Sequence, residues 1–164
     1  MGKDSFIIRK DVTLPNTNAF TQVEIDMGAY VDALGSSIVR VHNISVVYSD
    51  TLAGVPNVTS ECSAQYQLTT QTQSALTLAS DRSVVATGRL VCDGAGTVPT
   101  YTSHDSDVAP QHWTNGYLIA TEQLYLGGAA STGFAENVVV SIALECTVEK
   151  MSQSAAMALA LSQQ

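Results

Sequence analysis

The chain has 164 residues, of which 45% are hydrophobic and only 13% charged, and its formal net charge is −8. A chain of this length forms one domain with a core large enough to fold without disulfides or metals. The acidic balance argues against strong direct nucleic-acid binding, which needs clustered lysine and arginine to neutralise phosphates.

Three strands are predicted in the first fifty residues. Hydrophobic residues recur at strand spacing over 5–14, 20–27 and 37–50. In the third segment they change face halfway along, which predicts a β-bulge near His42 and Asn43.

A short helix is predicted between the second and third strands. Asp26 is a candidate N-cap, and Gly35 stands where a helix-ending glycine belongs. Between them, the apolar side chains form a helical stripe of Tyr30, Val31 and Leu34.

The rest of the chain continues as strands and loops, with loops predicted at 51–60 and 93–113 and after Gly127 and Gly128. The loop at 93–113 is long for a connection without regular structure, and such loops are often functional. Four further strands are predicted, at 63–70, 75–78, 83–92 and 115–127.

The segment 136–149 carries the most regular alternation of the sequence. One apolar and one mostly polar face indicate an antiparallel strand with a single buried side. The residues predicted to face the core are Val138, Val140, Ile142, Leu144, Cys146 and Val148.

These elements predict an all-β fold. Antiparallel strands with turn clusters between them, and no strand–helix–strand alternation, indicate a β-sandwich with Greek-key connections, of which the jelly roll is the eight-stranded form. We assign 1–150 to this domain and 151–164 to a C-terminal helical tail.

The tail is predicted to make contacts between subunits. It is too short to persist alone as a helix in water, so it must pack on something. It would lie either on the small side chains Val139, Ser141 and Ala143 of its own sheet or on a neighbouring subunit, and we favour the neighbour. The residues predicted for assembly are Met151, Ala155, Met157, Leu159 and Leu161, which form two sets at four-residue spacing.

Candidate chemistry is sparse. The loop residues His104, Asp105, Asp107 and His112 include ligand types that suit a divalent metal, although such residues are also common in solvated loops. Glu122 and Glu145 lie on predicted strands and are candidates for a glycosidase carboxylate pair. No nucleophile elbow, HExxH or phosphate loop occurs, so the sequence favours no enzyme.

Three cysteines, Cys62, Cys92 and Cys146, match neither a zinc site nor a disulfide framework. We interpret them as small buried hydrophobic residues, with one disulfide as the alternative. Lysine occurs only at positions 3, 10 and 150. Since lysine is depleted in interfaces, its absence from the body of the domain suits a subunit surrounded by neighbours, or else reflects an acidic proteome.

The stretches AYVDALGSSIVRVHNISVVYSD, NGYLIATEQLYLGGAASTGFAENVVVSIALECTVEK and MSQSAAMALALSQQ resemble the single jelly-roll capsid proteins of small icosahedral viruses, of the environmental type. The resemblance implies a structural subunit that self-assembles with copies of itself, and with other capsid proteins, into the shell of a virion. Its N-terminus departs from the basic arm of many such proteins, because it holds only Lys3, Arg9 and Lys10.

The polar N-terminus predicts no signal peptide, and no apolar stretch approaches the roughly 20 residues of a transmembrane helix. No cofactor is expected, except divalent cations such as calcium at subunit contacts. These would bind acidic turns at Asp50, Asp81, Asp93, Asp105 and Asp107. The alternative function is a β-sandwich binding module that recognises a carbohydrate or protein through the 93–114 loop.

Overall fold

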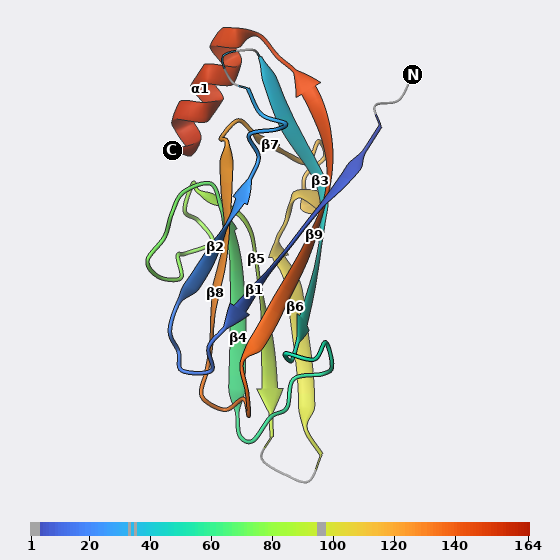
Figure 1. The fold of residues 1–164 in the computed structure, drawn as a ribbon, viewed down its shortest axis with the longest axis vertical. Helices are drawn as coiled ribbons and strands as arrows, with labels where there is room; N and C mark the ends of the chain where they lie inside the picture. The colour runs from blue at the N-terminus through green and yellow to red at the C-terminus, as the bar shows by residue number, and fades with distance from the viewer. Residues whose placement is uncertain (1–3, 33, 35, 95–97) are drawn as a thin grey trace.

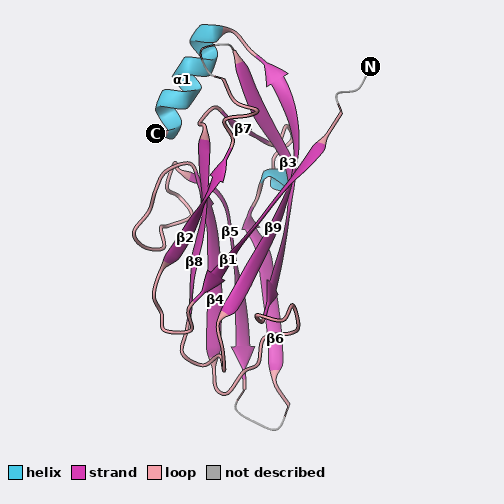
Figure 2. Ribbon diagram, in the orientation of Figure 1, coloured by secondary structure: helices cyan, strands magenta, loops and turns pink. Residues whose placement is uncertain are grey.

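The fold is that of a computed structural model, which describes residues 4–32, 34, 36–94 and 98–164. Within them nine strands are followed by one C-terminal helix (Figures 1 and 2). The elements are β1 (Phe6–Leu14), β2 (Thr21–Asp26), β3 (Ser37–Ser49), β4 (Cys62–Thr69), β5 (Val84–Asp93), β6 (Thr100–Val108), the 3₁₀ helix η1 (Pro110–His112), β7 (Tyr117–Ile119), β8 (Gln123–Ala130), β9 (Val138–Lys150) and α1 (Gln153–Gln163).

The strands form two antiparallel sheets packed face to face, in the orders β1-β9-β3-β7 and β2-β8-β4-β5-β6. With β6 set aside, the other eight strands pair first with last: β1 with β9, β2 with β8, β3 with β7 and β4 with β5. One long antiparallel hairpin rolled into two sheets gives this pattern, which is the jelly roll. The predicted all-β jelly roll with a C-terminal helix is therefore confirmed, and β6 is a ninth strand at the edge.

The core lies between the two sheets. The alternation of β9 places Val138, Val140, Ile142, Leu144 and Cys146 in it, as predicted, and the facing sheet contributes residues such as Tyr66, Leu68, Leu124 and Leu126. Val148 departs from the prediction, because it is 39% exposed. Its neighbour Thr147 is buried instead and lies 2.9 Å from the His42 ring.

The β-bulge predicted in the third strand is present. The register between β3 and β9 shifts between Val41 and Asn43, which leaves His42 as the extra residue. The shift turns Val39 and Val41 to the core before the bulge and Ile44 and Val46 to the core after it. One strand thereby follows the bend of the sandwich without losing its buried face.

The predicted helix over 26–35 is wrong for the described residues, which form turns and one β-bridge. Tyr30 and Val31 donate to the Met27 carbonyl, and a bridge between Asp32 and Ser37 ends the turn. The Asp26 side chain does accept from the Gly28 amide, at 2.8 Å, but it caps a turn and no helix follows. Gly35 lies outside the described residues.

The predicted strand at 75–78 is also wrong. Its backbone groups form hydrogen bonds with the side chain of Gln67, which is only 1% exposed. The Gln67 side-chain amide donates to the Ala75 carbonyl at 3.2 Å, and its oxygen accepts from the Thr77 amide at 2.8 Å. This segment therefore lies against the sheet as a loop.

Three predicted segments in the second half of the chain differ from the structure. The expected loop at 93–113 contains β6, which pairs with β5, and η1. The expected strand 115–127 is two strands in different sheets, β7 and β8, joined by a buried corner at Ala120 and Thr121. β8 also continues through Gly127 and Gly128, which were expected to open a loop.

Candidate assembly surface

The helix α1 begins at a defined cap. Ser152 accepts a hydrogen bond from the Ala155 amide at 3.3 Å, which satisfies one of the free amides of the first turn. The helix then crosses from the start of β3, past β7, to the end of β4, and lies at one end of the sandwich (Figure 1).

The inner face of α1 packs on its own domain. Ala156 is fully buried against Ile38 and Ala120. Partly buried neighbours complete this small cluster: Leu118, Met151, Leu159 and Ala160. The cluster is separate from the main core, so α1 adds a second hydrophobic contact to the sandwich.

Gln163 fastens the last turn of the helix to both sheets. Its side-chain amide donates to the Leu118 carbonyl at 2.6 Å, and its side-chain oxygen accepts from the Ala120 amide at 2.9 Å. Its backbone carbonyl accepts from Thr70 at the end of β4, at 2.7 Å. Gln163 is only 3% exposed, so these bonds form away from water.

We expect Gln163→Ala to lower the free energy of unfolding by about 1–3 kcal/mol, because it leaves two buried backbone groups unpaired. Urea unfolding followed by circular dichroism measures the change. Gln164→Ala, at the exposed neighbouring position, is the control and is expected to have no effect. Equal stability of both variants would contradict the anchoring role of Gln163.

The outer face of α1 carries exposed apolar side chains. Met157 is 41% and Leu161 67% exposed, and Ala155 and Ala158 are exposed as well, together with Ser154 and Ser162. The five predicted assembly residues therefore divide into two groups, since Met151 and Leu159 pack inward whereas Ala155, Met157 and Leu161 face outward.

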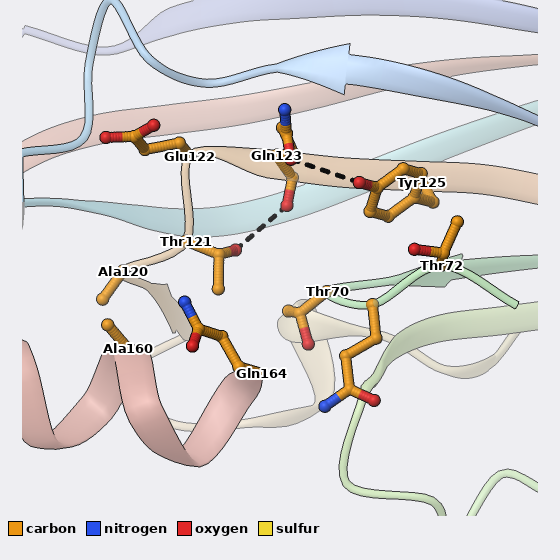
Figure 3. Close-up of a pocket in the computed structure, with 10 residues that line it drawn as sticks. Thr70, Thr72, Ala120, Thr121, Glu122, Gln123, Tyr125, Ala160 and Gln164 are labelled. Carbon is orange, nitrogen blue, oxygen red and sulfur yellow. Dashed lines mark hydrogen bonds between the residues drawn. The ribbon is translucent and has the colours of Figure 1, made fainter.

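A hollow of about 540 Å³ lies beside the last turn of α1, next to Ala160 and Gln164 (Figure 3). Its lining is mostly hydroxyl and amide side chains, with one ring and one carboxylate: Thr70, Gln71, Thr72, Thr121, Glu122, Gln123 and Tyr125. On the other side of α1, Leu159 and Ser162 line a second hollow of about 510 Å³ together with Arg40 and Arg82. The helix thus forms a ridge between two depressions.

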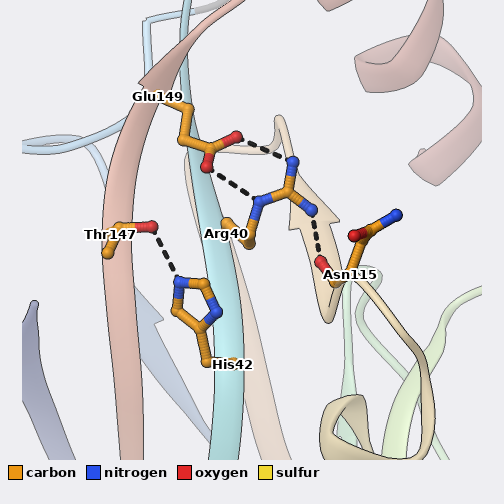
Figure 4. A network of polar contacts seen from close by, with 5 residues as sticks. All are labelled: Arg40, His42, Asn115, Thr147 and Glu149. Carbon is orange, nitrogen blue, oxygen red and sulfur yellow. Dashed lines mark hydrogen bonds and ion pairs between the residues drawn. The ribbon is translucent and has the colours of Figure 1, made fainter. Parts of the chain in front are cut away.

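A polar network borders the second hollow (Figure 4). Arg40 on β3 makes two hydrogen bonds of 2.8 Å to the Glu149 carboxylate on β9 and a third to the Asn115 carbonyl. The bonds to Glu149 raise the pKa of Arg40 above its usual value. The network fixes the chain that enters β7, against which α1 packs.

Sequence reasoning missed the residues that hold α1 in place. One predicted packing surface for the helix was Val139, Ser141 and Ala143. Ser141 and Ala143 instead line an open hollow beside Arg9, and α1 packs on Ile38 and Ala120. The spacing of Ala156, Leu159, Ala160 and Gln163 was the available signal, since these residues share one helical face. The sequence alone does not show that Gln163 is buried and hydrogen-bonded, because its partners, the Leu118 carbonyl and the Ala120 amide, lie far away in the sequence.

The metal candidates are spread along β6 and η1. His104 lies opposite Arg89 in the sheet, Asp107 is ion-paired with Arg89 at 2.8 Å, and His112 ends η1. The side chain of Asp105 lies outside the described residues. Among the side chains that are described, no three metal-ligating groups come together, so the metal site has no geometric support.

Three of the acidic turn residues are already bonded within the chain. Asp50 accepts from the amides of Leu52 and Gly54, and Asp81 accepts from Ser83, which lowers the pKa of Asp81. Asp107 pairs with Arg89. Calcium at subunit contacts stays a prediction, and these bonds would compete with it.

The carboxylate pair suggested for glycoside hydrolysis is not assembled. Glu122 lines the hollow beside α1, whereas Glu145 on β9 lines a different one and accepts a hydrogen bond from Asn43 at 2.7 Å. The two carboxylates therefore share no cleft.

In the part of the chain that the structure describes, no helix has the length and apolar character needed to cross a membrane. No protein-family model and no curated protein matches the sequence.

Similar folds occur among solved structures of VP1 from Merkel cell polyomavirus. The unassembled VP1 pentamer is 9% identical over 92% of this chain and 98% of that chain, with a TM-score of 0.41. VP1 in complex with GD1a oligosaccharide is 8% identical over 92% and 98% of the two chains, with a TM-score of 0.44. The jelly roll itself follows from the strand order described above.

Proposed function

We propose that this chain is a structural subunit that assembles with copies of itself into the shell of a virus particle, and that the outer face of α1 contacts a neighbouring subunit. The observation that carries the proposal is the exposed apolar face of Ala155, Met157, Ala158 and Leu161 on a helix whose other face is fixed. A helix held in this way presents its outer side chains with little further loss of conformational entropy on binding.

Two other features support a self-assembling subunit. α1 protrudes between two hollows, and a surface with such protrusions and hollows can pack closely against a complementary surface on a neighbouring subunit. Jelly rolls are also common in viral capsids, although they occur in lectins too, so the fold alone does not decide. The localisation that follows is the virion.

The assembly contact is tested by the double variant Met157→Asp/Leu161→Asp. Two carboxylates on this face would be desolvated in a contact but remain hydrated in the free subunit, so we expect an unchanged circular dichroism spectrum and a loss of large particles. Light scattering and negative-stain microscopy measure particle formation.

The matched control is Leu52→Asp, which places a carboxylate on an apolar side chain that is 88% exposed, in the loop after β3. This variant is expected to assemble normally. If the α1 double variant still formed particles, α1 would not be part of the subunit contact. A wild-type chain that stays monomeric under all conditions would refute the proposed shell.

A second candidate function is suggested by the hollow of Figure 3. Its hydroxyl and amide groups around the Tyr125 ring match the needs of a neutral carbohydrate, which combines hydrogen-bonding groups with an apolar face. This site would replace the 93–114 loop of the alternative hypothesis. Saturation-transfer NMR with a mixture of oligosaccharides tests it, with Tyr125→Ala as the variant expected to lose the signal.

A further inference from the structure

Two of the three cysteines lie opposite each other in one sheet. Cys62 begins β4, and its register partner on β5 is Cys92. Both thiols are free, and they are 7% and 1% exposed. Cys146 lies in the other sheet, where its partners are Phe6 and Val41, so it has no cysteine within its own register.

The backbone pattern fixes the separation of the pair. The Ser63 carbonyl accepts from the Ser131 amide, on the β8 side of β4. Since successive residues of a strand turn their backbone groups to opposite sides, those of Cys62 point toward β5, and Cys62 and Cys92 form a hydrogen-bonded pair with Cα atoms about 5.5 Å apart. Disulfides span Cα distances of about 4.4–6.8 Å, so this pair lies within reach of a bond.

The two thiols also influence each other. Burial, and to a smaller extent the neighbouring Cys62, raise the pKa of Cys92 to about 12. Burial also raises the pKa of Cys62, although its contact with Cys92 opposes the shift. Both groups are therefore protonated at neutral pH in the folded chain, and Cys62, the more exposed of the two, is the better placed to react first.

We propose that Cys62 and Cys92 form a reversible disulfide site that joins β4 to β5 when the folded protein meets a low-molecular-weight disulfide as oxidant. The inference is independent of the proposed shell function.

The reaction consists of two exchanges. The Cys62 thiol loses its proton and attacks one sulfur of the oxidant, which releases one equivalent of free thiol and leaves a mixed disulfide. Cys92 then loses its proton and attacks the Cys62 sulfur of that mixed disulfide, which releases the second thiol. The protein loses two hydrogen atoms, and the oxidant is reduced to two thiols.

Strand geometry makes this bond easy to reverse. Side chains directly opposite in a sheet have Cβ atoms about 4.5–5.5 Å apart, whereas a relaxed disulfide prefers about 3.5–4.5 Å. The bond therefore carries strain, and strained disulfides are more readily reduced. It would fasten the end of the sandwich opposite α1, where β4 begins and β5 ends (Figure 1).

The test incubates the native full-length chain with oxidised glutathione at mildly alkaline pH, blocks the remaining thiols with an alkylating reagent and determines the mass and the linked peptides. We expect one alkylated thiol, on Cys146, a peptide linked through Cys62 and Cys92, a higher thermal midpoint and full reversal by dithiothreitol. Cys146→Ala is expected to form the same link, whereas Cys62→Ala and Cys92→Ala keep two free thiols.

Three outcomes would overturn the proposal. The first is three alkylated thiols after incubation. The second is a mixed disulfide with glutathione that never resolves onto the partner cysteine. The third is a Cys62–Cys92 link that forms only when urea is present, since the bond would then belong to the unfolded chain.

Discussion

A Leu144→Asp chain is expected to be recovered unfolded. Leu144 is fully buried in the middle of β9, between Ile8 on β1 and Ile44 on β3. The substitution removes about 1.5–3 kcal/mol of hydrophobic stabilisation and buries a carboxylate without a partner, which costs several kcal/mol more. Since domains are stable by only about 5–15 kcal/mol, the sum removes most of the stability. Soluble yield and the cooperativity of urea unfolding measure the effect.

Two neighbouring positions calibrate this result. Ser141→Asp, on the exposed face of the same strand, is expected to fold normally. Ile142→Asp is expected to lie between the two, because Lys10 is the register partner of Ile142 on the edge strand β1 and can approach the new carboxylate. A soluble Leu144→Asp chain that unfolds cooperatively would contradict the placement of β9 in the core.

The second large effect is expected from Gly128→Ala. Gly128 lies on β8 between β2 and β4, and an added Cβ would stand 2.2 Å from the Gln65 carbonyl oxygen. This oxygen belongs to the backbone of β4, so the clash is relieved only if the strands move apart. We expect a loss of about 3 kcal/mol, at the upper end of the usual range for overpacking, and a thermal midpoint lower by roughly 6–12 °C.

Gly54→Ala is the matched control for this substitution. Its added Cβ would meet only the Asp50 carboxylate, at 3.1 Å, and this contact is relieved if the end of that side chain moves by a few tenths of an ångström. We expect little change in its melting temperature. If both alanine variants melted alike, the close approach of β8 and β4 at Gly128 would be wrong.

The sequence predicted the fold where one face of a strand is buried. β9 and the bulge of β3 follow from their alternation, because each has apolar residues at every second position on the core side. β6 escaped prediction because an edge strand that pairs only with β5 needs no apolar stripe, and its sequence TYTSHDSDV is polar on both faces. The corner between β7 and β8 escaped it because Ala120 and Thr121 carry no glycine or proline to mark the turn.

The candidate assembly surface was predictable only in part. Composition indicated a helix at the C-terminus, but its orientation depends on Gln163, whose bonding partners are Leu118 in β7 and Ala120 in the corner that follows it. The sequence predicted a single strand there, without this corner. The direction of Met157 and Leu161 follows from that anchor. A helix whose sides are both apolar gives no periodic signal that would choose between them.

The strand order also determines when this protein can fold during its synthesis. The inner positions beside the first strand of each sheet belong to β9 and β8, which lie between β1 and β3 and between β2 and β4. Both come from the last third of the chain, so β1 and β2 leave the ribosome without their hydrogen-bonding partners. Contacts between residues so far apart in sequence give a high contact order and slow folding. The sandwich therefore closes only after translation is nearly complete, and until then the early strands expose unpaired edges that chaperones can recognise.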